Sequence, residues 1–254
     1  MALVQPTVVL LHGFLGAARN LRGLVGQLQA ARTAWRVLAV DLPGHGAAPP
    51  LPPGASLEAV AQATWAALPP DLAGGPVSLV GHSLGGRVAM AMAACALAPP
   101  ARVALLDISP APALAGDRAV RALFALVMAA PAQVERREAL RDAWVAAGIP
   151  QALADWAATN LVRDGVHFVW RLDRAALAAF HARQLAEDLW PVAAALGPRL
   201  ALLRGGRSAF LDTSDCARLA GMGVQVSTLP AAGHFLQVDA PAEVLAWLLA
   251  TLGP

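Results

Sequence analysis

A serine flanked by glycines, between an apolar strand and a helical segment, constrains the fold of this sequence more than any other feature. The segment Gly81-His82-Ser83-Leu84-Gly85 follows the apolar run Val77–Val80, and a helical pattern begins at Gly86. Glycines on both sides allow a tight turn from strand to helix, so the hydroxyl of Ser83 would stand above the sheet at a helix N-terminus. This context predicts a nucleophilic serine, whereas a chance glycine-rich turn would lack the strand and the helix.

Short β-branched runs alternate with alanine-rich helical segments, which is typical of a mostly parallel sheet with helices on both faces. The sequence predicts about six strands, at Thr7–Leu11, Arg36–Val40, Pro76–Val80, Arg102–Leu106, Arg199–Leu203 and Val224–Leu229. Predicted helices lie at Leu57–Leu68, Gly86–Ala98, Asp215–Ala220 and Ala242–Leu252. We therefore expect an α/β fold.

One interval interrupts this alternation, because more than ninety residues separate Leu106 from the next predicted strand. Such a length is too great for a simple crossover. Its content is helical, with predicted helices at Asp117–Ala130, Gln133–Ala147 and Ala152–Asn160. We expect a helical cap at residues 109–190, inserted into a core made of residues 1–108 and 191–254.

Composition argues against several other classes of protein. The net charge is only +2 and the arginines form no stripe, so a nucleic-acid partner is not expected. Glycines and a proline interrupt the uncharged stretch Leu219–Val238, and Met1–Pro6 lacks the pattern of a signal peptide. Cys95 and Cys216 have no metal-ligand spacing. We expect a cytoplasmic protein with free thiols, no membrane span, a small-molecule substrate and no metal or organic cofactor.

A nucleophilic serine needs a general base and hydrogen-bond donors for the oxyanion. His234 lies in a loop between the last predicted strand and the last helix, which is the place of the base in the chain order serine, acid, histidine. The amides of Leu84 and of Phe14, in the segment His12–Gly16, are the candidate oxyanion donors. The other histidines considered are expected to be structural, loop or surface residues: His12, His45, His167 and His181.

The acid has two candidates. The usual place follows the penultimate strand, where Gly205-Gly206-Arg207-Ser208 carries a serine instead of an aspartate. Asp212 follows shortly after, and Asp107 ends the preceding strand. Both strand ends open on the edge of the sheet that carries Ser83, so either carboxylate could reach the imidazole. We favour Asp107, because a helix N-terminus already accounts for Asp212.

These residues together resemble the YbfF-like esterases of the α/β-hydrolase superfamily over nearly the whole chain. The matching segments are His12-Gly13-Phe14-Leu15-Gly16 with Asn20-Leu21, Gly81–Gly86, Asp107-Ile108-Ser109-Pro110, Phe168-Val169-Trp170-Arg171-Leu172, Gly205-Gly206-Arg207-Ser208 and Gly233-His234. The resemblance implies an α/β-hydrolase fold, Asp107 as the acid and Ser208 as an auxiliary polar group.

Two other segments are similar to the lyase MenH, a 2-succinyl-6-hydroxy-2,4-cyclohexadiene-1-carboxylate synthase of menaquinone biosynthesis. They are Asp41-Leu42-Pro43-Gly44-His45-Gly46 and Gly85-Gly86-Arg87-Val88-Ala89-Met90. Those lyases use the same triad chemistry to abstract a proton, but they carry the acid after the later strand. A MenH-like lyase is therefore the alternative to an esterase.

The expected activity is hydrolysis of small or medium carboxylic esters through an acyl-enzyme on Ser83. A hydrolase fold that only binds a ligand is the alternative from another class, although the intact set of Ser83, Asp107 and His234 argues against it. Candidate substrate-binding residues are Phe168, Trp170 and Arg87. Apolar and aromatic residues at helical spacing in the cap more often belong to the core than to a pocket. Phe124, Met128, Trp144 and Trp156 are therefore weaker candidates.

Overall fold

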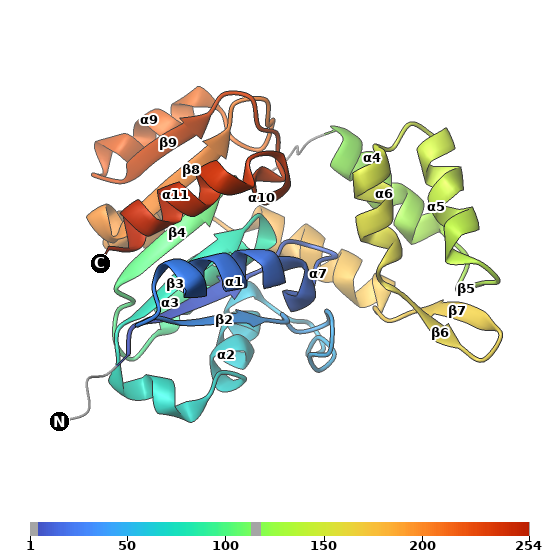
Figure 1. Cartoon of the computed structure of the whole chain (residues 1–254), viewed down its shortest axis with the longest axis horizontal. Helices are drawn as coiled ribbons and strands as arrows, with labels where there is room; N and C mark the ends of the chain where they lie inside the picture. The colour runs from blue at the N-terminus through green and yellow to red at the C-terminus, as the bar shows by residue number, and fades with distance from the viewer. Residues whose placement is uncertain (1–4, 113–117, 254) are drawn as a thin grey trace.

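A sheet of six parallel strands forms the centre of the molecule (Figure 1). The computed structural model describes residues 5–112 and 118–253. The strands lie in the order β2-β1-β3-β4-β8-β9. Their bounds are β1 Thr7–Leu11, β2 Arg36–Val40, β3 Val77–His82, β4 Arg102–Leu106, β8 Leu200–Gly205 and β9 Gln225–Leu229. Every neighbouring pair is parallel, which confirms the predicted α/β fold.

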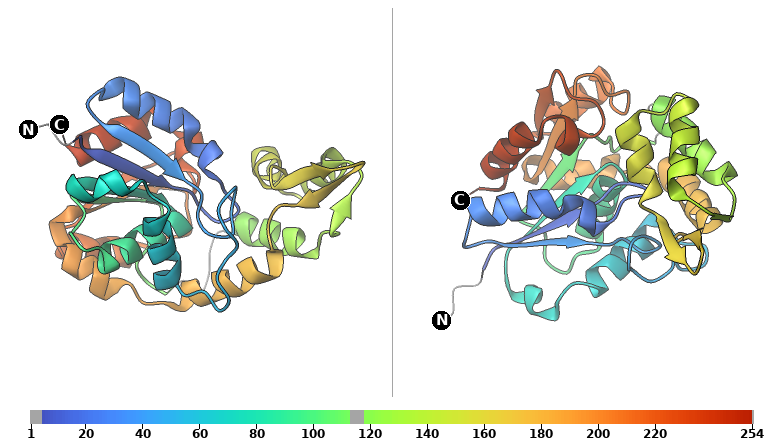
Figure 2. Two further views of the ribbon diagram at one scale, coloured as in Figure 1. Left: turned by 90° about the horizontal axis from the view of Figure 1, so that it is seen from below. Right: turned by 45° about the vertical axis from the view of Figure 1, so that its right-hand side comes forward.

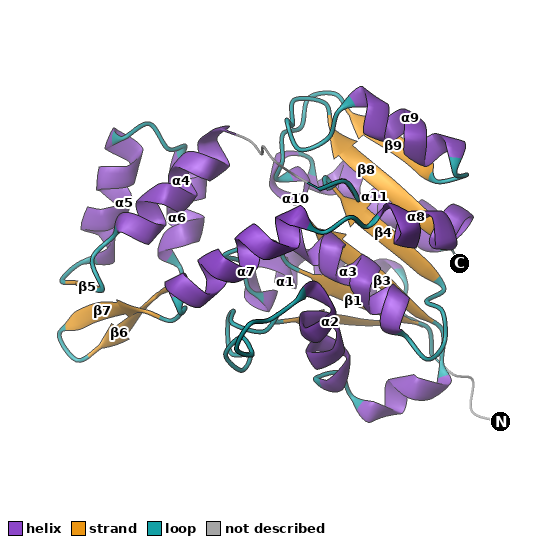
Figure 3. Ribbon diagram, turned by 180° about the vertical axis from the view of Figure 1, so that it is seen from behind, coloured by secondary structure: helices purple, strands orange, loops and turns teal. Residues whose placement is uncertain are grey.

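Alternating side chains of the strands build apolar layers on both faces of the sheet. In β1, Val8 and Leu10 pack with α1 (Arg22–Ala31) and α11 (Pro241–Leu252). Val9 and Leu11 pack with α2 (Leu57–Ala66) and α3 (Leu84–Cys95) on the other face. Successive residues of a strand point to opposite faces, so an uninterrupted apolar run buries both. Figure 3 shows α2, α3 and α8 in front of the sheet and α1 and α11 behind it. The core helices are α1 Arg22–Ala31, α2 Leu57–Ala66, α3 Leu84–Cys95, α8 Trp190–Leu196, α9 Thr213–Gly221, α10 Leu236–Asp239 and α11 Pro241–Leu252, with 3-10 helices η1 Ala18–Leu21, η2 Pro70–Gly74 and η3 Gly197–Arg199.

The insertion after β4 forms a cap beside the carboxyl ends of the strands (Figure 2). Its elements are α4 Arg118–Ala129, β5 Gln133–Val134, α5 Arg137–Ala146, α6 Gln151–Ala158, β6 Leu161–Asp164, β7 His167–Trp170 and α7 Arg174–Ala186. Helices were predicted in the regions of α4, α5 and α6, whereas α7 and the antiparallel sheet β5-β7-β6 were not predicted. The predicted helix Gln133–Ala147 is wrong at its start, because β5 pairs there with β7. Asp117, the predicted start of the first cap helix, lies outside the described residues.

The hairpin between β6 and β7 has a local cause. Its loop contains Gly165 and Val166, since Asp164 pairs with His167. Gly165 has a φ of 58°, the left-handed backbone that two-residue hairpin turns require and that glycine adopts without strain. Glycine at the first position of the loop, as in Gly165-Val166, was therefore a usable hairpin signal.

Two expectations about the described residues concern membranes and thiols. None of the helices in residues 5–112 and 118–253 is long and apolar enough to cross a membrane. Cys95, at the end of α3, and Cys216, in α9, are both unpaired. Burial raises the pKa of the Cys95 thiol, which keeps this side chain protonated at neutral pH.

Arg87 in α3 forms hydrogen bonds with both ends of the cap and so connects them to the core. Its side chain is fully buried, and its two terminal nitrogens donate to four main-chain carbonyl oxygens. The carbonyls of Ser109 and Ala111 lie at the start of the insertion, and those of Gln184 and Glu187 lie at its end. All four terminal N–H groups are used in this way, which favours a structural role over the predicted substrate-binding role.

We expect Arg87→Met to destabilise the protein strongly. The four carbonyls would lose a charged donor in a site that water does not reach, at a cost of roughly 3–5 kcal/mol of the free energy of unfolding. Urea unfolding at neutral pH, followed by tryptophan fluorescence, measures this loss. Arg183→Met is the matched control, because Arg183 is exposed and donates to the single carbonyl of Gly54. Equal stability of the two variants would contradict this structural role of Arg87.

Candidate active site

Ser83 stands at the sharp turn between β3 and α3. It has a φ of 53° and a ψ of −120°, a region that side-chain-bearing residues rarely adopt. Such a conformation costs on the order of 1–3 kcal/mol and persists only where the surroundings hold it. Here the Ser83 amide donates to the carbonyl of Leu106 at 3.1 Å, and the Ser83 carbonyl accepts from the amides of Gly86 and Arg87. The sequence predicted this passage from strand to turn to helix.

Close backbone packing explains the two glycines around this serine. A Cβ atom on Gly81 would lie 2.2 Å from the carbonyl oxygen of Gly85. A Cβ atom on Gly85 would lie 2.3 Å from the carbonyl oxygen of Leu11. Both distances are far below van der Waals contact, so the turn excludes any side chain at either position. The spacing of the motif thus follows from the approach of β1 and α3 at this turn.

His234 lies in the loop between β9 and α10 and is buried. Its Nδ1 atom lies 2.8 Å from Oδ2 of Asp107. The ring of Phe210 stacks on the imidazole, with 3.8 Å between centroids and 22° between planes. Nδ1 therefore faces the carboxylate, which leaves Nε2 as the nitrogen that can accept a proton.

His82 supports His234 through the backbone, a role that sequence reasoning missed. Burial lowers the pKa of His82 to about 3, so its ring is neutral at pH 7. Its Nε2 lies 2.8 Å from the carbonyl oxygen of His234 and must be the donor, because a carbonyl can only accept. His82 directly precedes Ser83, so this bond ties the loop of the candidate base to the candidate nucleophile. Its position inside the glycine-serine motif was the only local signal.

Asp107 directly follows β4. Its side chain is fully buried, and its backbone has a φ of 55°. Its amide donates to the carbonyl of Leu203 at 2.9 Å. Oδ1 accepts from the amide of Gly205 at 2.8 Å, whereas Oδ2 accepts from the hydroxyl of Ser208 and faces Nδ1 of His234. The carboxylate therefore joins the ends of β4 and β8 to the loop after β9.

Asp212, the alternative acid, lies outside this cluster. It is exposed at the N-terminus of α9, where its Oδ1 accepts from the Asp215 amide and from the Ser214 hydroxyl, both at 2.7 Å. The amide of Asp215, followed by the Ser214 hydroxyl, lowers the pKa of the Asp212 carboxyl. Because this carboxylate caps a helix, the geometry favours Asp107 as the partner of His234.

The segment His12–Gly16, which we call the oxyanion loop, passes directly beside Ser83. A Cβ atom on Gly13 would lie 3.4 Å from the Cβ atom of Ser83. The candidate donors, the amides of Phe14 and Leu84, are thus on two segments that meet at this serine. Two backbone amides beside a nucleophile are the arrangement that stabilises an oxyanion.

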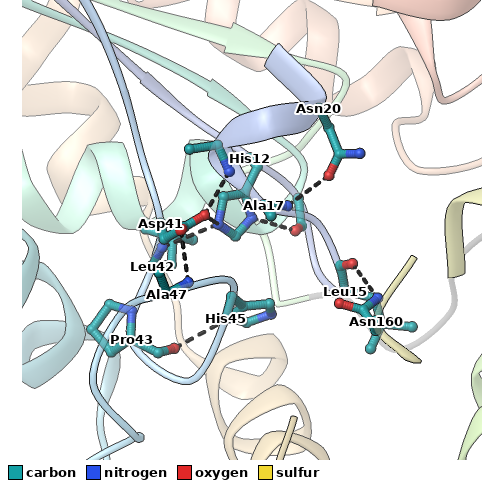
Figure 4. A network of polar contacts seen from close by, with 12 residues as sticks. His12, Leu15, Ala17, Asn20, Asp41, Leu42, Pro43, His45, Ala47 and Asn160 are labelled. Atoms are coloured by element: carbon teal, nitrogen blue, oxygen red, sulfur yellow. Dashed lines mark hydrogen bonds and ion pairs between the residues drawn. The ribbon is translucent and has the colours of Figure 1, made fainter. Parts of the chain in front are cut away.

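The core holds the oxyanion loop through His12 (Figure 4). Its Nδ1 lies 2.8 Å from the carbonyl oxygen of Gly13, and its Nε2 accepts from the amide of Leu42 at 3.0 Å. Burial lowers the pKa of His12 to about 4, so the neutral ring with a proton on Nδ1 makes both bonds. Asp41 adds to the network by accepting from the amides of Ala18 and Ala47.

The cap meets the oxyanion loop through aromatic contacts. The ring of Phe14 lies 4.3 Å from that of His181 on α7 and 5.2 Å from that of Phe124 on α4, measured between centroids. His45, predicted to be a loop or surface residue, lies in a loop but is buried, with its ring 5.9 Å from Phe14. Phe124 is thus a cap aromatic that the structure brings next to the candidate site.

Phe168 and Trp170 have a different environment. Both are on β7, in the small sheet at the end of the cap farthest from the core (Figure 1). The guanidinium groups of Arg137 and Arg163 lie over the ring of Phe168. Trp170 donates to the carbonyl of Pro131 and packs near Trp144. The structure places these contacts within the cap, so a substrate-binding role for the two residues stays a prediction.

Comparison with known proteins gives a partial match to an enzyme of the lyase class that is the alternative to an esterase. The 2-succinyl-6-hydroxy-2,4-cyclohexadiene-1-carboxylate synthase of Salmonella agona is 36% identical over 90 residues, which are 35% of this chain and 33% of that protein. This match covers too little of either chain to decide the family.

Longer matches reach proteins named as lipases and esterases. Mouse sn-1-specific diacylglycerol lipase ABHD11 is 33% identical over 247 residues, covering 94% of this chain and 78% of that protein. Lipase LipV of Mycobacterium tuberculosis is 32% identical over 226 residues, covering 86% and 84%. The structure of a marine microorganism esterase has a TM-score of 0.80 and 18% identity, covering 96% of this chain and 94% of that one, and bears on the fold alone. A sequence model of the alpha/beta hydrolase family matches residues 8–247, so the chain belongs to this family.

Proposed function

We propose that this chain hydrolyses carboxylic esters through an acyl-enzyme on Ser83. The observation that carries the proposal is the 2.8 Å contact between Nδ1 of His234 and Oδ2 of Asp107, at the edge of the sheet where the turn presents Ser83. The names of the lipase relatives support the same reaction class. Serine, histidine and aspartate in these roles are the general solution for acyl transfer at neutral pH.

The proposed reaction has two halves. Nε2 of His234 takes the proton of the Ser83 hydroxyl as the serine oxygen attacks the ester carbonyl. The amides of Phe14 and Leu84 stabilise the oxyanion, and the alcohol leaves with the proton held by His234. Water then attacks the acyl-enzyme with His234 again as the base, which releases the carboxylic acid and restores Ser83.

Asp107 orients the imidazole and stabilises its protonated form during each half-reaction. The donors on its carboxylate, the amide of Gly205 and the hydroxyl of Ser208, fix the plane of the carboxylate. Ser208 thus fits the auxiliary role implied by the resemblance to YbfF-like esterases. The residues named above supply the nucleophile, the base, the acid and the oxyanion donors, so no step of this mechanism requires a metal ion or an organic cofactor.

A MenH-like lyase is the second candidate, supported by the partial match to the Salmonella synthase. The same Ser83 and His234 would then abstract a proton instead of attacking a carbonyl. Against this alternative, Asp107 faces His234 from the end of β4, whereas the similar lyases carry their acid after the later strand. A panel of p-nitrophenyl esters of increasing acyl length, assayed beside the substrate of the synthase, separates the two. We expect turnover of short or medium esters and none of the lyase substrate.

Ser83→Ala should abolish ester hydrolysis, with a loss on the order of 10⁶-fold if the triad acts as a unit. Initial rates with p-nitrophenyl acetate measure this loss, and intact-mass analysis after a fluorophosphonate probe reports on the serine itself. Ser214→Ala, at an exposed serine in α9, is the matched control and should behave as wild type. Activity of Ser83→Ala near the wild-type rate would refute Ser83 as the nucleophile. Failure of the probe to label folded wild-type protein at Ser83 would instead favour a ligand-binding role.

The two candidate acids give opposite expectations for the same substitution. Asp107→Asn should lower kcat by roughly 10⁴-fold, because an amide can favour the wrong imidazole tautomer. Asp212→Asn should leave kcat unchanged, because that carboxylate only caps α9. Steady-state kinetics of the two purified variants give the comparison. The reverse pattern would move the acid to the position after β8 and support the MenH-like alternative.

A further inference from the structure

The oxyanion loop is held on one side by the core and on the other side by the cap. On the core side, Nε2 of His12 accepts from the amide of Leu42 at 3.0 Å, and Asp41 accepts from the amide of Ala18 just beyond the loop. On the cap side, Nδ2 of Asn160 donates to the carbonyl of Leu15 at 2.8 Å (Figure 4). Leu15 directly follows Phe14, whose amide is the proposed oxyanion donor. The position of that amide therefore depends on a side chain of the cap.

Leu15 is the point where the two parts of the molecule meet. Its φ is 60°, a left-handed conformation that a branched side chain adopts only when its surroundings hold it. Its side chain is 4% exposed and packs in the apolar cluster of the cap with Leu123, Val127 and Trp144. The carbonyl of this residue points to Asn160. Packing and hydrogen bonding from the cap therefore both act on the residue next to the donor.

Asn160 is itself fixed within the cap. It follows α6, its amide donates to the carbonyl of Ala157, and its own carbonyl accepts from the amide of Arg171 at the end of β7. The side chain is 1% exposed, and Nδ2 also lies 3.2 Å from the carbonyl oxygen of Ala157. Both neighbours of Nδ2 are carbonyl oxygens, so only the nitrogen of the amide can face them.

The side-chain oxygen of Asn160 lowers the stability of the folded protein. Oδ1 of Asn160 is buried and has no hydrogen-bond partner among the described residues. A buried acceptor without a partner is destabilising, so general packing does not explain an asparagine here. The donor function of Nδ2 toward Leu15 does explain it.

We propose that Asn160 is a positioning residue that makes the oxyanion hole depend on the docked cap. This inference rests on the proposed ester hydrolysis through Ser83. Asn160 contacts neither Ser83 nor the substrate; it acts through Leu15 on the direction of the Phe14 amide. When the cap is displaced from the loop, Leu15 can leave its left-handed conformation and the amide turns away from the oxyanion.

Asn160→Ala should lower kcat for a p-nitrophenyl ester about 10-fold to 100-fold, less than removal of an oxyanion donor, because the Phe14 amide is misdirected and not lost. KM should change less than 3-fold, as expected when an interaction specific to the transition state is removed. The affinity of a trifluoromethyl ketone should fall by the same factor as kcat, because its adduct with Ser83 places an oxyanion at the same amides. A merely structural role for Asn160 would not link these two losses.

Thr159→Val is the matched control. Thr159 is the neighbouring residue, and its hydroxyl donates to the carbonyl of Trp156 within the cap, away from the oxyanion loop. We expect kcat and inhibitor affinity within 2-fold of wild type. Asn160→Ser, whose side chain is too short to reach Leu15, replaces the alanine variant if that variant does not fold.

Hydrogen exchange of the oxyanion loop provides a readout that needs no activity. Amides of residues 14–16 should exchange faster in Asn160→Ala than in Thr159→Val. If wild type shows no ester hydrolysis and no labelling at Ser83, the proposed function fails, while the exchange still decides the role of Asn160. Unchanged exchange, or an active Asn160→Ala with kcat and inhibitor affinity within 2-fold of wild type, would overturn the inference. A change in KM alone would also overturn it.

Discussion

The buried carboxylate of Asp107 is the interaction on which the candidate site depends. Donors from the end of β8 and from the loops after β8 and β9 converge on its two oxygens: the amide of Gly205, the hydroxyl of Ser208 and the imidazole of His234. A carboxylate with no access to water needs such partners, since burial without them is expensive. These partners fix the ends of β4 and β8 and the loop after β9 relative to one another. The same contacts that keep the carboxylate buried also point Nδ1 of His234 at it.

Local strain accompanies this arrangement. The residues other than glycine with a positive φ in the described chain are Leu15, Ser83 and Asp107, and each belongs to the candidate site or to its oxyanion loop. Strained backbone of this kind persists where packing and hydrogen bonds hold it in place. The strand ladders on both sides of β3 hold Ser83, the bonds of the carboxylate hold Asp107, and the cap holds Leu15. The sheet thus supports the conformations that the proposed chemistry at Ser83 needs.

The sequence predicted the features that depend on local pattern. The glycine-serine motif between strand and helix located Ser83, and β1, β2 and β4 have the predicted bounds. β3 and β8 end later than predicted, because Gly81-His82 and Arg204-Gly205 have the composition of turns but continue the parallel ladders. The strands of the cap were missed because they are short and partly exposed, so they lack an apolar alternation.

Side chains whose role depends on distant partners could not be found from the sequence. Asn160 and Leu15 are 145 positions apart, and His82 and His234 are 152 apart. Neither pair has a spacing that a periodic pattern reveals. Arg87 was predicted to bind the substrate, yet its side chain is buried and donates to carbonyls at the two ends of the cap. The choice between Asp107 and Asp212 likewise required the geometry.

The imidazole of His234 allows the most direct test of the account. Proton and nitrogen NMR of the histidine side chains at neutral pH distinguishes the tautomer with the proton on Nδ1 from the one with the proton on Nε2. A His234→Gln variant assigns the signals by their loss. We expect a proton on Nδ1 of His234, shifted downfield by its bond to Asp107, and we expect this signal to disappear in Asp107→Asn. A proton on Nε2 in the wild-type protein, or an Nδ1 signal unaffected by Asp107→Asn, would contradict the account.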